Sequence, residues 1–138
     1  MIVKNEENNL GGILSDIRDV VDEICIVDTG STDGTIALAE SFGARVGHFP
    51  WVNDFAAARN QSIQLADSDY LLWLDADDRV DEKDRKALVT LKTKLRHQKD
   101  RAYMLKIVSS SEDVPDSVSY QTRIIPNMDA IRFEGRIH

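Results

Sequence analysis

Residues 70–78 read YLLWLDADD: five apolar residues run directly into three carboxylates within four positions. A short apolar run bounded by polar residues is typical of a strand that is covered on both faces. Because side chains alternate along a strand, Asp75 and Asp77 share one side if the extended geometry continues past the apolar run. Two carboxylates at such a strand end suit Mg²⁺ or Mn²⁺. The alternative is that Asp77 or Asp78 caps a helix that begins near Asp81.

Short apolar runs alternate with amphipathic stretches along the rest of the chain. The pattern predicts strands at residues 1–4, 23–28, 44–49, 70–74, 101–108 and 118–125, and helices at residues 10–21, 36–42, 55–66 and 82–97. A polar loop is expected at residues 109–117. This order predicts the α/β class, a doubly wound, mostly parallel and Rossmann-like sheet flanked by helices. At 138 residues the chain is expected to form a single domain, residues 1–138.

Polar loops follow three of the predicted strands, at residues 5–9, 28–33 and 75–79. The carboxyl ends of parallel strands meet at one edge of the sheet, which is where open α/β sheets bind ligands. All three loops are rich in acids or amides, so their convergence favours a ligand site over a helix cap. Taken alone, Asp28 could equally accept hydrogen bonds from the turn at Gly30. Glu6 could equally be a solvated loop charge.

The chain carries 17 Lys and Arg against 24 Asp and Glu, a net charge of −7. Nucleic-acid binders need a basic surface, so nucleic acid is excluded as a partner. A phosphorylated partner remains compatible if a divalent cation bridges it to the acidic loops. The longest apolar run, residues 70–74, is too short for a transmembrane segment, and Cys25 has no second cysteine for an internal disulfide. We therefore expect a cytoplasmic protein.

Four segments resemble, in content and order, the motifs of family 2 glycosyltransferases: residues 1–7 (MIVKNEE), 26–35 (IVDTGSTDGT), 57–60 (AARN) and 74–78 (LDADD). Residues 133–138, FEGRIH, resemble a later segment found in one bacterial branch of that family. The resemblance implies a GT-A fold that binds a nucleotide-diphosphate sugar. It also implies transfer of the sugar to an acceptor, with a uridine diphosphate (UDP) sugar as the expected donor.

The resemblance further implies roles for individual residues. Asp75 and Asp77 match the Asp-x-Asp motif, with Asp77 as the direct ligand of Mn²⁺ or Mg²⁺. Asp28 matches the residue that approaches the nucleoside base, Glu6 falls in the loop that lines the nucleotide pocket, and Arg59 matches a position near the base or diphosphate. A metal held there would stabilise the charge that grows on the leaving diphosphate. Arg59 could add charge-assisted hydrogen bonds to the diphosphate or to the carboxylates of the motif themselves. It could instead pair with a surface carboxylate, an interaction that is common and contributes little.

Relatives continue well beyond this length and carry the catalytic base and the acceptor site in their later portion. The resemblance therefore implies a truncated nucleotide-binding part of a larger enzyme. Glu134 is the only late carboxylate in a recognisable family context, which makes it the candidate catalytic base. His138, in the same segment, is a further candidate metal ligand. Many relatives carry Asp at the position of Thr29, so the contacts to the base stay open.

Three other functional classes share some of these sequence features. The chain could bind donor and metal without transferring sugar, which turnover and binding measured on one preparation would distinguish. A sugar-nucleotide nucleotidyltransferase shares the acidic metal chemistry, but it should carry a Gly-rich phosphate loop after its first strand. Residues 5–9, NEENN, contain no glycine. A phosphotransferase of the haloacid-dehalogenase type carries its Asp-x-Asp motif after the first strand, whereas the motif here follows the fourth.

Overall fold

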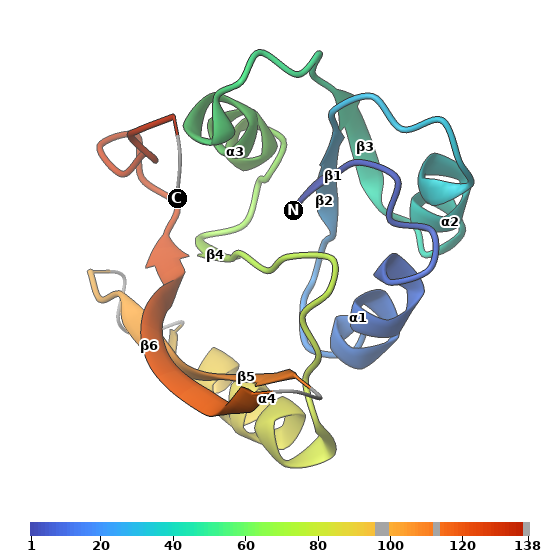
Figure 1. The fold of residues 1–138 in the computed structure, drawn as a ribbon. Coiled ribbons are helices and arrows are strands. Elements are labelled where there is room, and N and C mark those ends of the chain that lie inside the picture. Colours follow the sequence, from blue (N-terminus) through green and yellow to red (C-terminus); the bar gives the residue numbers. More distant parts are fainter. Residues whose placement is uncertain (96–99, 112–113, 137–138) are drawn as a thin grey trace.

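The computed structural model describes residues 1–95, 100–111 and 114–136 (Figure 1). Strands and helices alternate from the first strand to the fourth helix, as the sequence predicts. In chain order the elements are β1 (Ile2–Val3), α1 (Leu10–Ile17), β2 (Cys25–Asp28), α2 (Thr35–Ser41), β3 (Arg45–His48), α3 (Phe55–Gln64), β4 (Tyr70–Leu72), α4 (Glu82–Leu95), β5 (Tyr103–Ser111) and β6 (Val114–Pro126). None of the helices in this described part is long and apolar enough to cross a membrane.

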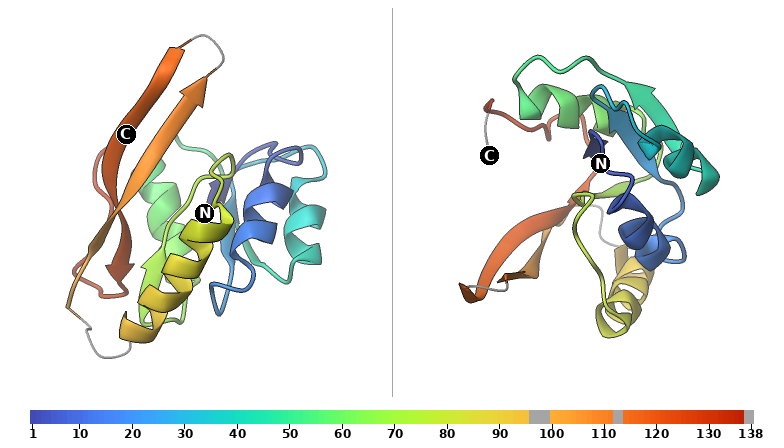
Figure 2. Two further views of the ribbon diagram at one scale, coloured as in Figure 1. Left: turned by 90° about the horizontal axis from the view of Figure 1, so that it is seen from below. Right: turned by 45° about the vertical axis from the view of Figure 1, so that its right-hand side comes forward.

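The first half of the chain forms a parallel sheet in the order β1-β2-β3. Helices α1 and α2 lie together on one side of this sheet and α3 lies on the other (Figures 1 and 2). The apolar face of α1 is fully buried, and its residues Leu10, Ile13 and Leu14 pack with Val3 and Ile26 of the sheet. Helices on both faces of a parallel sheet confirm the predicted α/β class.

The second half forms an antiparallel sheet in the order β4-β6-β5, covered by α4. Leu88 of α4 packs with Ile124 of β6 and with Val20 after α1. Strands β5 and β6 form a long hairpin that projects from the body (Figure 2), with Ser109 paired to Ser117. The prediction of a polar loop at residues 109–117 is therefore wrong for residues 109–111, which belong to β5, and for residues 114–117, which belong to β6. A hairpin open to solvent can carry polar residues on its strands, and so a polar run does not exclude strand pairing.

Strand β4 ends at Leu72, two residues earlier than expected. The chain then turns at residues 76–77, where the N–H of Asp78 donates to the carbonyl of Asp75 at 3.2 Å. The extended geometry thus does not continue through the carboxylates. Leu74 and Ala76 are buried in the core beside Val3, because they fill the space at the end of β1. This burial brings the turn against the parallel sheet.

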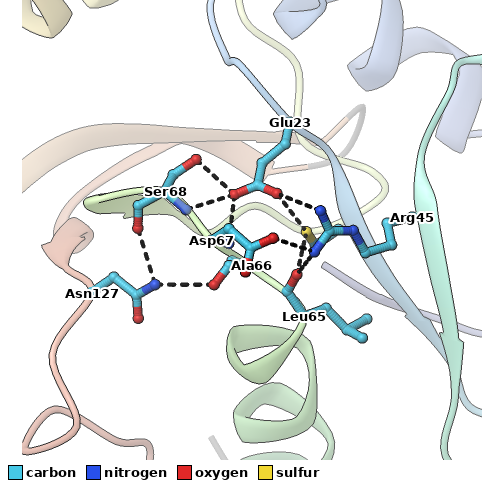
Figure 3. Close-up of polar contacts among 8 residues, drawn as sticks. Glu23, Arg45, Leu65, Ala66, Asp67, Ser68 and Asn127 are labelled. Atoms are coloured by element: carbon cyan, nitrogen blue, oxygen red, sulfur yellow. Dashed lines mark hydrogen bonds and ion pairs between the residues drawn. The ribbon is translucent and has the colours of Figure 1, made fainter.

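A polar cluster around Glu23 joins the amino ends of β2 and β3 to the turn between α3 and β4 (Figure 3). One carboxylate oxygen of Glu23 accepts hydrogen bonds from the N–H of Asp67 at 2.8 Å and from the N–H and hydroxyl of Ser68 at 2.7 and 2.6 Å. Arg45 pairs with Asp67 at 3.0 Å and with Glu23 at 3.4 Å, and it donates to the carbonyl of Leu65. The cluster therefore fixes the sheet at the end opposite to the carboxyl ends of its strands.

Candidate functional site

A cleft of about 300 Å³ lies at the carboxyl ends of β1 and β2, beside the turn that follows β4. It brings together four of the residues that the sequence singles out, namely Glu6, Arg59, Asp75 and Asp77. The rest of its wall is formed by Ile2, Val3, Lys4, Thr29, Trp51, Phe55 and Ala76. The site thus lies where ligands bind in open α/β sheets.

The loops after β1 and β2 are joined to each other by hydrogen bonds between side chains and main chain, as their predicted convergence requires. Glu6 N–H donates to the Thr35 hydroxyl at 2.8 Å. Further bonds run from Asn5 N–H to Ser31 Oγ (2.9 Å), from Thr32 N–H to Asn5 Oδ1 (2.8 Å) and from Gly34 N–H to Glu7 Oε2 (2.6 Å). Asn5 and Gly30 adopt positive φ angles of 55° and 114°, which glycine and asparagine tolerate best.

Asp28 lies beneath this pair of loops rather than in the wall of the cleft. Its side chain is buried, and its carboxylate accepts the N–H of Gly30 at 3.0 Å and the N–H of Ser31 at 3.1 Å. His48 Nδ1 lies 3.9 Å from the same carboxylate. This geometry matches one of the two roles that the sequence left open for Asp28, namely that of hydrogen-bond acceptor in the turn at Gly30. The contact of Asp28 with a nucleoside base stays a prediction.

Helix α3 determines the position of Arg59. Asp54 caps this helix by accepting the N–H of Ala57 at 2.9 Å, and small alanines let its face approach the sheet closely. Arg59 is only 7% exposed, and its Nη2 donates to Asp75 Oδ1 at 3.0 Å. Burial lowers the pKa of Arg59, while the charge of Asp75 opposes that shift. Arg59 is therefore a buried guanidinium that holds one oxygen of the partly exposed carboxylate of Asp75.

Residues 75–78, the acid loop, are also held by Arg123 of β6, which the sequence interpretation missed. Arg123 is 3% exposed, and its Nη1 lies 3.0 Å from Asp78 Oδ2 and 3.5 Å from Asp75 Oδ2. Its guanidinium also lies over the ring of Trp73, 3.9 Å from the centroid, while that of Arg59 lies 4.3 Å from the same centroid. No local motif indicates these contacts, because Arg123 and Asp75 are 48 positions apart.

Asp77 is the exposed member of the acid loop, and it forms no hydrogen bond or ion pair with a described residue. It does not cap α4. That helix begins at Glu82, and the carboxylate of Asp81 accepts the N–H of Asp84 at 2.7 Å. The free carboxylate of Asp77 faces the cleft beside the arginine-held carboxylate of Asp75.

The acidic residues do not form a complete metal cage by themselves. Among the described residues, no group of three or more His, Cys, Asp or Glu is arranged to hold a metal ion. A single free carboxylate beside a cleft fits an ion such as Mg²⁺, which is commonly held by one or two carboxylates together with substrate phosphates. Asp77 and Asp75 therefore fit a shared ion, whereas His138 lies outside the described residues.

Glu134 is exposed and does not belong to the wall of the cleft. The backbone on either side of it is nevertheless attached to α3. Asn60 exchanges two hydrogen bonds of 2.9 Å with the carbonyl and N–H of Phe133, and Phe55 N–H donates to the carbonyl of Arg136 at 3.1 Å. The role of Glu134 as the catalytic base stays a prediction.

Sequence reasoning also did not place Lys4, Trp51 and Phe55 in the cleft. The rings of Trp51 and Phe55 meet edge to face, with centroids 4.7 Å apart. Lys4 is exposed and makes no ion pair with a described residue. A larger hollow of about 480 Å³ lies away from this site, between α4 and the end of α3, and is lined mainly by apolar side chains. None of the described candidate residues lines that hollow.

Residues 1–129 match the family model described as glycosyl transferase family 2. The chain belongs to this family. A TPR repeat-containing protein of Synechococcus elongatus is 38% identical over 141 residues, which cover 100% of this chain and 33% of that protein. An uncharacterized glycosyltransferase of Rickettsia felis is 30% identical over 110 residues, or 78% of this chain and 38% of its own length. The chain thus spans roughly a third of the length of these family relatives.

Solved structures agree with this family assignment. The crystal structure of S. aureus TarS superposes with a TM-score of 0.66 over 91% of this chain and 27% of its own, at 16% identity, and so supports the fold alone. Glucosyl-3-phosphoglycerate synthase of M. tuberculosis in complex with UDP superposes with a TM-score of 0.50 at 27% identity, over 56% of this chain and 32% of its own. The expected GT-A fold is confirmed.

Proposed function

We propose that this family 2 chain binds a nucleotide-diphosphate sugar, with a UDP-sugar as the favoured donor, for a metal-dependent glycosyl transfer. The observation that carries the proposal is the free carboxylate of Asp77 beside a fixed Asp75 in a cleft at the carboxyl ends of the strands. Support also comes from the M. tuberculosis synthase, which has been crystallised with Mn²⁺, UDP and glucosyl-3-phosphoglycerate. That structure superposes with a TM-score of 0.50 at 25% identity, over 56% of this chain and 33% of its own.

The residues that line the cleft would have different roles in binding the donor. Asp77 and Asp75 would hold Mn²⁺ or Mg²⁺, which acts as a Lewis acid on the leaving diphosphate. Lys4 lines the cleft, makes no ion pair with a described residue, and offers its ammonium to phosphate oxygens. Arg59 holds Asp75 through Nη2 and also lines the cleft, and its contact with the diphosphate stays a prediction. Glu6 lines the same cleft, and its contact with the nucleotide stays a prediction.

Glu134 remains our candidate for the base that deprotonates the acceptor. A base must lie within hydrogen-bond reach of the attacking group, and the exposed Glu134 does not line the cleft. This placement favours, as a second candidate function, a donor-binding unit that does not complete the transfer by itself. The acceptor is unidentified in both cases.

Calorimetry with UDP tests the proposal. Titrations are carried out in MnCl₂ and, separately, in excess chelator. We expect clear binding with Mn²⁺ and much weaker binding in chelator, since the cleft supplies too few carboxylates to bind an ion tightly without phosphates. Equal affinity in both buffers would contradict the metal-dependent model. Release of sugar from UDP-sugars, measured on the same preparation, separates transferase from donor-binding unit.

A further inference from the structure

The acid loop has one partner that no family motif accounts for, the buried guanidinium of Arg123. It lies 3.0 Å from Asp78 Oδ2, and that same oxygen accepts the main-chain N–H of Asp75 at 2.8 Å. Arg123 therefore acts on the backbone of the turn as well as on its carboxylates. Asp77 stands in this turn, between the two residues that Arg123 contacts.

Trp73 couples Arg123 to the start of the acid loop. The main-chain N–H of Trp73 donates to the main-chain carbonyl of Arg123 at 3.0 Å, and its indole Nε1–H donates to the carbonyl of Thr122 at 2.8 Å. The Arg123 guanidinium donates in turn to the carbonyl of Trp73 at 3.4 Å and lies over its ring. A planar guanidinium combines stacking with hydrogen bonds to several acceptors, which a lysine ammonium cannot reproduce.

The charges of this group leave one carboxylate uncompensated. Arg59 and Arg123 both pair with Asp75, and Arg123 also pairs with Asp78. Two guanidiniums thus balance these two carboxylates, while Asp77 keeps its charge for a ligand. A loop without Arg123 would bring three carboxylates close together with Arg59 as their remaining ion-pair partner among the described residues, and their repulsion would open the turn.

We propose that Arg123 is a positioning residue, which keeps the acid loop closed so that Asp77 presents its carboxylate to the donor diphosphate and its cation. This inference rests on the proposed function. It predicts that Arg123 affects the metal-dependent part of nucleotide binding, although its own side chain is buried and does not line the cleft.

The test compares UDP affinity in MnCl₂ with UDP affinity in chelator, for the wild type and for Arg123→Gln and Arg123→Lys. We expect Arg123→Gln to reduce the ratio of the two affinities by about 10- to 100-fold, as partners that orient metal ligands usually do. Arg123→Lys should be more thermally stable than Arg123→Gln, but its ratio of UDP affinities in MnCl₂ and in chelator should remain nearly as low. The control is Arg45→Gln, which breaks largely exposed polar contacts at the opposite end of the sheet. That control should lower the melting temperature and leave the ratio unchanged.

The outcomes separate this inference from the proposed function. If the wild type binds UDP equally in both buffers, the proposed function fails and the positioning role fails with it. If the wild type shows the metal dependence and a folded Arg123→Gln keeps it, Arg123 only stabilises the fold and the inference is overturned. Should Arg123→Gln not fold, Asp78→Asn removes the other end of the same contact. An unchanged ratio in that variant would overturn the inference equally.

Discussion

Asp77 differs from its neighbours in the acid loop because no described residue engages its carboxylate, whereas Asp75 and Asp78 are paired with buried arginines. We predict that Asp77→Asn lowers UDP affinity in MnCl₂ by at least about tenfold, because the loss of a residue that only orients a metal ligand already costs that much. The melting temperature should hardly change, since exposed substitutions usually shift stability by less than about 0.5 kcal/mol. Calorimetry and thermal melts check both statements. Asp19→Asn, another exposed aspartate, is the control.

Trp51 forms the aromatic wall of the cleft together with Phe55. The sequence alone favours core packing for such residues, but an indole at a ligand cleft can stack a planar base. We predict that Trp51→Ala weakens uridine and UDP binding by about 1–3 kcal/mol, the range found for stacking of one base on one aromatic ring. The loss should be equal with Mn²⁺ and with chelator, and Trp51→Phe should restore most of it. Unchanged uridine affinity would show that the base lies elsewhere.

The buried carboxylate of Asp28 stabilises the loop that follows β2. Its carboxylate satisfies the N–H groups of Gly30 and Ser31. We expect Asp28→Ala to lower the free energy of unfolding by about 1–3 kcal/mol, because these donors lose their acceptor. Asp28→Asn keeps one acceptor oxygen and should cost less. If chemical denaturation shows no difference between wild type and Asp28→Ala, the carboxylate does not support the turn.

At the scale of helices and strands, the sequence predicted local elements well and long-range partners poorly. The predicted helix at residues 55–66 is α3, Phe55–Gln64, and the predicted strand at residues 23–28 contains β2, Cys25–Asp28. Apolar periodicity and capping residues determine such segments locally. The contact of Arg123 with the acid loop depends instead on how β6 pairs with β4, which periodicity does not report. The family motifs identified Arg59 and Asp75 and allowed a bond between them, and the fold shows that this bond forms.

Helix α3 anchors the last described segment through Asn60, whose amide bonds both main-chain groups of Phe133. We predict that Asn60→Ala speeds hydrogen exchange at the Phe133 amide about tenfold, which corresponds to roughly 1.4 kcal/mol for these hydrogen bonds. Exchange detected by mass spectrometry or NMR measures the change. Asn8→Ala, at an exposed loop position, should leave the Phe133 amide as slow as in the wild type. The anchor would be disproved by equal rates in all three proteins.

At the scale of the whole molecule, Glu23 makes stability depend on pH. Burial alone would raise the pKa of Glu23, but hydrogen bonds from Ser68 and Asp67 and the charge of Arg45 outweigh it and lower the pKa below 4.5. The charged form is therefore favoured by folding. Its contribution is complete above the unfolded pKa, near 4.5, and is lost as the pH falls through the lower folded pKa.

We accordingly predict that Glu23→Gln destabilises the protein by about 1.5–3 kcal/mol at pH 7, the range for hydrogen bonds to a charged group. The difference from the wild type should shrink as the pH falls below 4.5 and through the lowered pKa of folded Glu23, where Glu23 itself takes up a proton. Thermal melts from pH 3 to pH 7 measure both trends. Glu40→Gln removes an exposed charge on α2 and should show neither. A constant difference across this pH range would mean that the charge of Glu23 is not what holds the cluster.

The chain contains only two tryptophans, and they occupy different positions relative to the cleft. Trp51 forms part of its wall, and Trp73 lies against the two arginines that hold Asp75. Indole emission responds to nearby charge and to water, so each ligand has its own optical reporter. A nucleoside should quench Trp51, whereas a shift of the acid loop should change the emission of Trp73. Titrations of Trp51→Phe and Trp73→Phe would then follow base docking and carboxylate movement separately, without any added label.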